Sequence, residues 1–335
     1  MRLNRIIIYG GLTSAKNTGI GKYAKFLIKS LRKYKPYLVY INNKNLKLRL
    51  FEEFLVSFKS MFLKRNDLCI FSSERDLPFS IFSRSAIKII VIHDLRFLKE
   101  KGIRNFMLKK IFSLTKFQKI ICVSKSISKD LGKLGYTSEI LYNPVEIKNK
   151  QLIYNKKLYC IPKKDKLEFC TLGSFEKRKN IEYFLYAAEF FPKYKFNIFI
   201  GKFYFENANR NIIYKIRKIN NINLFVGLND NKLFKKMKCS KIFLSFSNYE
   251  GFGRTYIEAQ KIGIPVLALS NNITKEVLLD SAFLMKEFSI INFTEGVEEI
   301  VNNYDLYVRK SFINSDRFSY KKFDKKLNNI VSDFL

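Results

Sequence analysis

The stretch EGFGRTYIEA, residues 250–259, determines how the rest of this chain is interpreted. It follows an apolar, strand-like run, IFLSFS (242–247), and leads into a second apolar run, so the pattern is strand, glycine turn and helix start. The glycines would let a ligand approach main-chain N–H groups closely, and a helix N-terminus attracts an anion. Two carboxylates, Glu250 and Glu258, suit sugar hydroxyls as hydrogen-bond partners. The stretch therefore predicts a phosphate held by the backbone and a sugar held by carboxylates, against the alternative of a plain turn with two solvated glutamates.

Length and composition indicate a folded protein with two domains. With 335 residues the chain can bury two cores, and a hydrophobic content of 47% excludes a disordered chain. Its apolar runs fall far short of the roughly 20 residues that span a bilayer. The N-terminus, MRLNRIIIYGG, lacks the longer apolar region of a signal peptide and predicts a first core strand instead. A cytoplasmic location is expected.

The cysteines and the single histidine argue against disulfides and metal sites. Five cysteines, an odd number, are scattered along the chain without a CxxC pair, so free thiols in a reducing cytosol are expected. One histidine cannot form the ligand cluster that a zinc site needs. No metal and no cofactor are therefore expected.

Short β-branched or aromatic runs alternate with longer amphipathic stretches, which is typical of parallel sheets with crossover helices. The strand candidates are RIIIYG, YLVYIN, LCIFS, KIIVIHD, KIICVS and EILYN, then LEFCTLG, KFNIFIG, INLFVG, KIFLSFS and PVLAL. The Lys- and Asn-rich segment 145–166 is the best linker candidate. The pattern predicts an α/β chain with two Rossmann-like, doubly wound parallel-sheet domains, 1–150 and 151–317. Their ligands are expected at the carboxyl ends of the strands, in an interdomain cleft.

The Glu-x7-Glu spacing within EGFG…EA…G-PV resembles the hallmark of retaining nucleotide-sugar glycosyltransferases with the GT-B fold, the glycosyl transferases group 1, and of their mannosyltransferase-like members. The resemblance extends in the right order from Gly10 to Tyr320. It implies an N-terminal acceptor-side domain, a C-terminal donor domain, and a closing helix in 318–335 that packs back onto the N-terminal domain. It also implies that a hexose moves from a GDP- or UDP-linked donor to form an α-glycosidic bond without a metal.

The segment TLGSFEKRKN, residues 171–180, resembles the part of that family that neutralises the donor pyrophosphate. There a glycine precedes a basic pair, which Arg178 and Lys179 match here, and the resemblance assigns the phosphate contact to Lys179. Cations at a helix start are disfavoured by the helix dipole unless an anion binds there. The chain departs from the pattern at Ser174, where some relatives carry an arginine, and Arg178 or Arg254 could compensate.

The resemblance also assigns roles around the two carboxylates. Glu258 would hold the ribose hydroxyls and Glu250 the hydroxyls of the transferred sugar, while main-chain groups of the glycine turn would hold the phosphates. The GIGKY loop near the N-terminus does not form GxGxxG, but it resembles a phosphate-facing loop of the family. The expected donor contacts are Gly19, Gly21, Arg178, Lys179, Gly251, Phe252, Gly253, Arg254 and Glu258.

His93, the only histidine, ends the strand-like run KIIVIHD, where open α/β sheets place residues that face a ligand. A lone histidine in an apolar run is more often a packed structural residue. The segment VIHDL nevertheless resembles the family's active-site histidine, which implies that His93 faces the transferred sugar and acts in catalysis with Glu250 when the cleft closes. In that family the leaving phosphate helps to deprotonate the acceptor.

The charge is strongly positive and unevenly spread. Residues 1–150 hold 31 basic and 10 acidic residues, whereas residues 151–335 hold 31 and 19. Such a field favours anionic partners. An A/T-rich coding bias is the competing explanation, because lysine supplies 47 of the 62 basic residues.

Three basic, aromatic-rich amphipathic stretches lie in the N-terminal half, around residues 22–35, 47–65 and 104–117. Each is either a core helix with a solvated charged face or a surface for anionic lipid headgroups. In the first stretch the basic face consists of Lys22, Lys25, Lys29 and Lys33.

The predicted function is hexose transfer to a lipid-linked or cell-surface glycan acceptor, by an enzyme attached peripherally to the anionic inner face of the membrane. A nucleic-acid-binding protein would explain the charge and the 33 Phe and 19 Tyr residues. It would not explain Glu-x7-Glu, and the chain has no nucleic-acid-binding motif, so no nucleic-acid partner is expected. A GT-B relative that acts as a phosphorylase or a sugar-nucleotide epimerase remains open.

Overall fold

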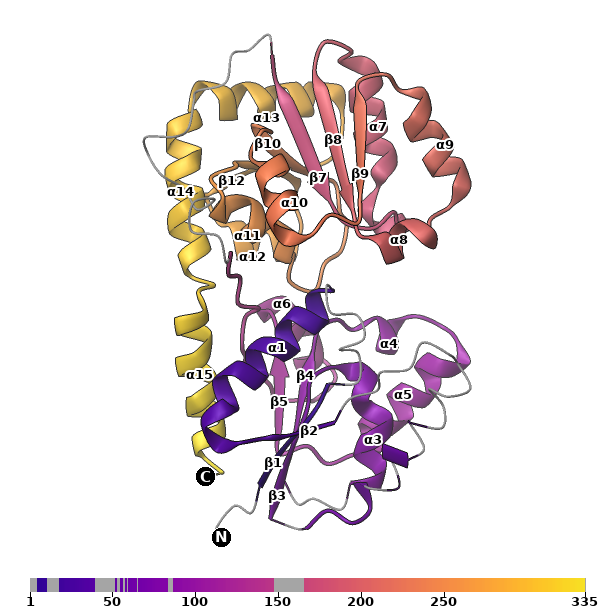
Figure 1. Cartoon of the computed structure of the whole chain (residues 1–335), viewed down its shortest axis with the longest axis vertical. Coiled ribbons are helices and arrows are strands. Elements are labelled where there is room, and N and C mark those ends of the chain that lie inside the picture. The colour runs from indigo at the N-terminus through magenta and orange to yellow at the C-terminus, as the bar shows by residue number, and fades with distance from the viewer. Residues whose placement is uncertain are drawn as a thin grey trace. The chain divides into compact units, whose positions relative to one another are not determined.

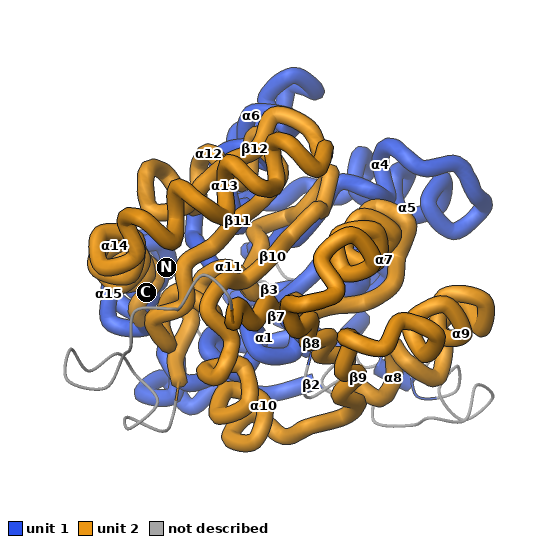
Figure 2. Tube along the Cα trace, turned by 90° about the horizontal axis from the view of Figure 1, so that it is seen from above, with its two compact units in different colours: residues 1–144, 320–335 blue, residues 145–319 orange. Residues whose placement is uncertain are grey.

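The computed structural model describes residues 5–10, 18–39, 52, 55–56, 58, 60–64, 66–83, 87–147 and 166–334. The chain divides into two compact units, which we call unit 1 (residues 1–144 and 320–335) and unit 2 (residues 145–319) (Figure 2). The predicted domain boundary after residue 150 lies in the segment 148–165, outside the described residues.

Unit 1 is built on six parallel strands in the order β2-β1-β3-β4-β5-β6 (Figure 1). The strands are β1 (Arg5–Tyr9), β2 (Tyr37–Val39), β3 (Asp67–Phe71), β4 (Ile87–Ile92), β5 (Lys119–Cys122) and β6 (Glu139–Ile140). Several are continuous apolar runs because a parallel sheet is covered on both faces, and all five residues of β3 are buried. The strand order reverses between β1 and β3, and such a switch point is where open α/β sheets bind ligands.

The helices of unit 1 include one from each end of the chain. The described helices are α1 (Gly19–Leu31), α3 (Leu77–Phe82), α4 (Arg96–Lys99), α5 (Ile103–Leu114), α6 (Lys125–Gly132) and α15 (Tyr320–Ser332). α15 packs on α1: the ring of Tyr23 lies edge-on to Phe323 at 5.4 Å, and the Ser30 hydroxyl donates a hydrogen bond to the Tyr320 hydroxyl at 3.3 Å. The last helix of the chain therefore belongs to the same core as the first.

Unit 2 contains a second sheet of six parallel strands, in the order β12-β11-β10-β7-β8-β9. They are β7 (Glu168–Leu172), β8 (Lys195–Ile200), β9 (Ile222–Val226), β10 (Ile242–Ser245), β11 (Val266–Leu269) and β12 (Ala282–Met285). Counted within the unit this is the 3-2-1-4-5-6 order of a doubly wound sheet, with its switch point between β7 and β10.

Helices cover both faces of the second sheet (Figure 1). They are α7 (Ile181–Phe190), α8 (Lys202–Glu206), α9 (Arg210–Lys218), α10 (Asp230–Met237), α11 (Arg254–Lys261), α12 (Asn272–Leu278), α13 (Ile290–Asn302) and α14 (Tyr304–Asp316). One core cluster joins apolar residues of α7 and α13 to the sheet, and a separate cluster joins those of α10 and α11. The presence of two clusters confirms the predicted doubly wound arrangement.

Each of the eleven strand candidates corresponds to a strand, whereas β12 was not predicted. The sequence of β12, AFLM, contains no β-branched residue. The strand lies at the edge of the sheet and, among the described strands, pairs only with β11. It forms because parallel pairing with β11 and the burial of Ala282 and Met285 outweigh its weak local preference.

Two other features bear on the environment of the protein. Among the described helices, none has the length and apolar character needed to cross a bilayer. Cys69, Cys122 and Cys170 are buried free thiols and Cys239 is an exposed one, whereas Cys160 lies outside the described residues.

Candidate active site

The candidate donor site lies in unit 2, in the two loops that follow β7 and β10. These strands are neighbours at the switch point of the sheet, so the loops after them meet at its carboxyl edge. Two hydrogen bonds tie the loops together: Asn180 Nδ2 donates to the carbonyl of Phe246 at 2.8 Å, and Asn248 N donates to the carbonyl of Arg178 at 2.9 Å. The predicted basic segment and the start of the Glu-x7-Glu motif are therefore held side by side.

The basic pair lies on a single 3₁₀ turn, Lys177–Lys179, directly before α7. Asn180 ends this turn in the left-handed region with φ 45°, a conformation that asparagine tolerates better than most residues. The Lys179 side chain passes over the backbone at Gly173, where a Cβ atom would lie 3.8 Å from its Cε and Nζ. The turn thus directs Lys179 across the end of β7.

Glu250 is the carboxylate on which the basic pair converges. It is 8% exposed, forms an ion pair with the Lys179 ammonium and accepts a hydrogen bond from Arg178 Nη1 at 3.0 Å. Burial by itself would raise the pKa of Glu250, but the charges of Lys179 and Arg178 outweigh it and lower the pKa below its ordinary value. Arg178 is itself fixed, because it also donates to the carbonyl of Tyr249 at 2.8 Å and to Glu176 at 2.7 Å. Glu250 is therefore an ionised, oriented hydrogen-bond acceptor.

Glu258 has a separate cationic partner. It lies one turn into α11 and accepts a hydrogen bond from Arg254 Nε at 2.9 Å, and both side chains are largely buried. The two carboxylates of the motif are thus held by different cations. Glu176, which pairs with Arg178, was not among the predicted site residues. Its position two residues before Arg178 was the signal in the sequence that could have indicated this ion pair.

The glycine turn is required by packing as well as by any ligand. Gly253 has φ 77°, and a Cβ atom on it would lie 2.2 Å from Cε2 of the Tyr256 ring. Tyr256 is buried, and its hydroxyl accepts a hydrogen bond from the Ser245 hydroxyl at the end of β10 at 3.3 Å. The Phe252 side chain packs edge-on against Phe318 at 5.1 Å. Packing of the Tyr256 and Phe252 side chains therefore holds the turn in place. The sequence pattern did not indicate this structural role.

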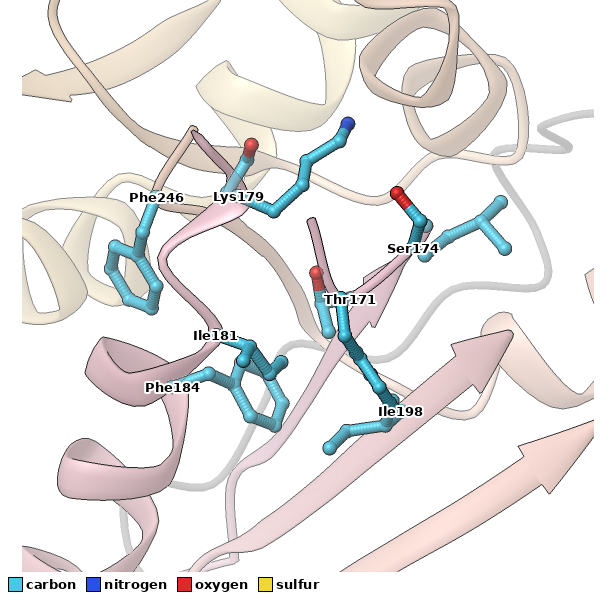
Figure 3. A pocket seen from close by; sticks show the side chains of 11 residues that line it. Thr171, Ser174, Lys179, Ile181, Phe184, Ile198 and Phe246 are labelled. Carbon is cyan, nitrogen blue, oxygen red and sulfur yellow. The ribbon is translucent and has the colours of Figure 1, made fainter. Parts of the chain in front are cut away.

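A hollow opens beside this cluster (Figure 3). Its empty volume, including the part open to solvent, is about 400 Å³. Residues from β7, the loop after it, α7, β8 and β10 line it, namely Thr171, Leu172, Gly173, Ser174, Phe175, Lys179, Ile181, Phe184, Ile198, Ser245 and Phe246. Ser174 therefore lies on the wall of the hollow. Arg178 and Arg254, the two residues expected to compensate for it, are both paired with carboxylates.

His93 directly follows β4 in unit 1 and is buried. Its Nε2 lies 3.0 Å from the carbonyl oxygen of Ser72, and since a carbonyl only accepts, Nε2 carries the proton and Nδ1 has the lone pair. Burial lowers the pKa of His93 to about 4, so the ring is neutral near pH 7. The Tyr23 ring contacts it edge-on at 4.8 Å. The strand-end position predicted for His93 is observed.

Glu74 is a buried acid beside His93 that the sequence analysis missed. Its Oε2 accepts a hydrogen bond from His93 N at 3.1 Å. Burial, followed by the nearby charge of Asp94, raises the pKa of Glu74 to about 7. The signal in the sequence was SSERD directly after the apolar run of β3, but the contact depends on the pairing of β3 with β4.

Replacing Glu74 with glutamine is expected to change how stability depends on pH. The folded-state pKa of about 7 exceeds the ordinary 4.5, so this group stabilises the fold below pH 4.5, and the contribution is lost as pH rises through 7. The Glu74→Gln variant has no such proton to lose. Its free energy of unfolding should therefore rise relative to wild type between about pH 5 and about pH 7.5, as urea titrations would measure. Because His93 is present in both proteins its own titration cancels, and parallel curves would contradict this role of Glu74.

The predicted residues near the N-terminus lie on α1, apart from Lys33, which lies in the 3₁₀ turn Arg32–Tyr34 directly after it. Gly19 is the first residue of α1. Thr18 caps the helix, because its hydroxyl accepts a hydrogen bond from Gly21 N at 3.2 Å. Of the four lysines, Lys29 lies over the Tyr320 ring of α15 at 3.6 Å and Lys33 over the Tyr34 ring at 4.7 Å. Lys22 is half-buried and Lys25 is exposed. α1 is thus a helix with a charged outer side that α15 partly covers.

The structure therefore gathers Arg178, Lys179 and Glu250 into one cluster, pairs Arg254 with Glu258, and holds His93 against Ser72 and Glu74. Within the described part of the chain, no three His, Cys, Asp or Glu side chains gather in a way that could hold a metal ion.

Residues 161–317, which contain all the unit 2 site residues, match the family model described as glycosyl transferases group 1. An uncharacterized 41.2 kDa protein in the cps region of Klebsiella pneumoniae is 30% identical over 192 residues, 53% of this chain and 48% of that protein. The O-antigen biosynthesis glycosyltransferase WclY of Escherichia coli is 27% identical over 227 residues, 65% of this chain and 62% of that protein. The matches thus span less than two thirds of either curated relative.

Solved structures share the fold over nearly the whole chain. Sucrose-phosphate synthase of Thermosynechococcus elongatus has a TM-score of 0.79 at 14% identity, covering 98% of this chain and 99% of that one. HepE of Anabaena, in complex with UDP-glucose, has a TM-score of 0.73 at 15% identity, covering 98% and 99%. These similarities confirm the predicted GT-B fold. The chain is therefore similar to the glycosyl transferases group 1 over residues 161–317 and shares the GT-B fold over nearly its whole length.

Proposed function

We propose that this protein is a retaining glycosyltransferase that moves a hexose from a nucleotide-sugar to a glycan acceptor and forms an α-glycosidic bond. The observation that carries the proposal is the cluster of Lys179, Arg178 and Glu250 at the β7–β10 switch point, inside the region that matches the family model. The related WclY is named an O-antigen biosynthesis glycosyltransferase, and HepE was solved with UDP-glucose. Both names agree with polysaccharide biosynthesis from a nucleotide-sugar.

In the proposed reaction the bond between the sugar C1 and the phosphate oxygen breaks, and a bond from C1 to the acceptor oxygen forms on the same face. The proton of the acceptor hydroxyl passes to the leaving phosphate. Lys179 is proposed to stabilise the charge that develops on the diphosphate, since fixed cations in a partly buried site lower such barriers by several kcal/mol. Glu250 would then accept hydrogen bonds from the sugar, and Glu258 from the ribose.

His93 is proposed as the contribution of unit 1 to transfer. Because its ring is neutral with Nδ1 unprotonated, it can accept a hydrogen bond from a sugar hydroxyl rather than act as a cation. The His93→Ala variant is expected to keep donor affinity and lose most transfer activity. If the variant unfolds while its folded fraction stays fully active, His93 is a packing residue only.

The acceptor is proposed to be a lipid-linked or cell-surface glycan, reached from the cytoplasmic side by an enzyme that attaches peripherally to the membrane. The donor is proposed to be a GDP- or UDP-linked hexose, used without a metal or a cofactor. A mannosyltransferase and a glucosyltransferase are separated by comparing GDP-mannose with UDP-glucose.

The proposal is tested by incubating the protein with a panel of nucleotide-sugars and a lipid-linked acceptor extract, with EDTA present. Release of the nucleoside diphosphate that requires the acceptor, with an α-linked product by NMR, is the expected result. Turnover that requires orthophosphate would identify a phosphorylase, and conversion of the donor without acceptor would identify an epimerase. Salt-dependent RNA binding without any donor turnover would identify a nucleic-acid-binding protein.

A further inference from the structure

The helix α5 is apolar on two opposite sides. Leu108 and Phe112 lie on its inner side and are buried. On the outer side four apolar residues are largely exposed: Ile103 (82%), Phe106 (66%), Met107 (57%) and Leu114 (76%). Their spacing of three, four and eleven positions from the first places them on one face of a helix. A helix at an aqueous surface normally carries polar residues there, so this face indicates a partner.

Cations surround the outer apolar face. Between Glu100 and Asp130 the sequence has eight basic residues and no acidic one. At 100° per residue, Arg104 and Lys109 flank the apolar face on either side, and Lys110 lies within it. The exposed cations in and next to α5 are Lys101, Arg104, Lys109, Lys110 and Lys116.

The neighbouring helix α3 packs against α5 (Figure 1) and adds exposed apolar residues. The Ser80 hydroxyl of α3 lies 3.2 Å from the Thr115 hydroxyl, directly after Leu114. Ile81 and Phe82, the next two residues of α3, are exposed. We name this group of outer α5 residues together with Ile81 and Phe82 the α5 surface.

We propose that the α5 surface docks onto an anionic lipid bilayer, with its apolar side chains in the boundary between headgroups and acyl chains and its cations on the headgroups. Long basic side chains can extend from among buried apolar residues to the headgroups, which accommodates Lys110. A nucleic acid would use the cations but leave the aliphatic side chains of Ile103 and Leu114 without a partner. The inference rests on the proposed membrane-bound acceptor and identifies the surface that would reach it.

The basic side of α1 is a weaker candidate for this contact. None of the residues of α1, all of which are described, is a large apolar side chain that is exposed. In addition, the Lys29 ammonium already lies over the Tyr320 ring, at 3.6 Å. α1 can therefore contribute charge but no insertion.

Fluorescence gives a direct test because the chain contains no tryptophan. Phe106→Trp places the sole indole on the α5 surface, and Phe203→Trp, at a position 68% exposed on α8 of unit 2, is the matched control. With vesicles of phosphatidylglycerol and phosphatidylcholine, emission of Phe106→Trp is expected to shift to the blue and to be quenched by brominated acyl chains. The control should not change. Equal quenching of both, or vesicle binding without quenching at position 106, would overturn the proposal.

Co-sedimentation with the same vesicles tests the charges. Changing Arg104, Lys109 and Lys110 to glutamine is expected to weaken binding on the order of a hundredfold. The control changes Lys215, Arg217 and Lys218, three exposed cations of α9, and should have little effect. An equal loss in both variants would mean that net charge alone drives binding, which would contradict a specific surface.

Donor binding separates this proposal from the proposed function. Nucleotide-sugars should stabilise the Arg104, Lys109 and Lys110 variant as much as the wild type, because the donor site is in unit 2. Quenching at position 106 with no donor stabilisation in any variant would uphold the α5 surface and overturn the proposed enzyme. Donor stabilisation without vesicle binding would uphold the proposed enzyme and overturn the α5 surface.

Discussion

Replacing Glu250 with alanine is expected to lower the rate of sugar transfer about ten- to hundredfold. Glu250 is buried and ionised, and a hydrogen bond from a sugar hydroxyl to such a group is worth about 1.5–3 kcal/mol. The variant should also unfold more easily, because Lys179 and Arg178 lose their shared carboxylate. Steady-state kinetics and urea unfolding measure the two effects.

Two other carboxylates serve as controls for Glu250. Glu176 also pairs with Arg178 but has a more exposed side chain, so Glu176→Ala should change turnover little. Glu258→Ala should instead weaken donor binding, because Glu258 is proposed to hold the ribose. A Glu250→Ala variant with wild-type turnover would remove this residue from the site.

Replacing Gly253 with alanine is expected to destabilise unit 2 by about 2–5 kcal/mol. The left-handed conformation costs an alanine about 1–2 kcal/mol, and displacing the buried Tyr256 ring adds about 1–3 kcal/mol. The clash arises because the new Cβ would lie 2.2 Å from a ring carbon. Donor affinity should fall as well, since the turn and the start of α11 would shift.

Gly201→Ala is the matched control for Gly253. It lies at the end of β8 in the same unit, has an ordinary φ of −67°, and its new Cβ would meet Tyr204 at 3.4 Å. Thermal unfolding should show a much smaller loss than for Gly253→Ala. Equal losses would mean that neither the positive φ nor the Tyr256 contact is responsible.

The sheets were predictable because buried parallel strands are continuous apolar runs that can be recognised without their neighbours. β12 was missed because its four residues have only a weak strand preference, without a β-branched residue, and the strand depends on pairing with β11. The contact between Lys179 and Glu250 joins residues 71 positions apart. The resemblance gave each of them a role, but their pairing follows from β7 and β10 being neighbours, which no local pattern contains.

The glycine turn and His93 show the same limit. The turn was predicted from its glycines, yet the clash that requires Gly253 comes from Tyr256, whose ring position depends on the tertiary packing. His93 was predicted at a strand end, whereas Glu74 reaches it only through the adjacent strand β3.

The basic, aromatic-rich stretches of the N-terminal half look alike in the sequence, and burial separates two of them. The aromatic and aliphatic side of α1 packs into unit 1, where Tyr23 and Leu27 are fully buried. α5 instead buries Phe112 and exposes Phe106, six residues earlier. α5 has one apolar side that is buried and one that is exposed. Charges and apolar residues counted in the sequence are the same for both, so they could not show which side is in the core.

The central claim is that Lys179 binds the phosphates of a nucleotide-sugar at the β7–β10 switch point. Thermal unfolding with GDP- and UDP-sugars tests it most directly, using wild type, Lys179→Met and, as a control, Lys177→Met at an exposed position of the same turn. At a donor concentration about a hundredfold above Kd, binding should stabilise wild type and the control by about 2.7 kcal/mol. The Lys179→Met variant should lose most of that shift, whereas equal shifts in all three proteins, or none with any donor, would contradict the claim.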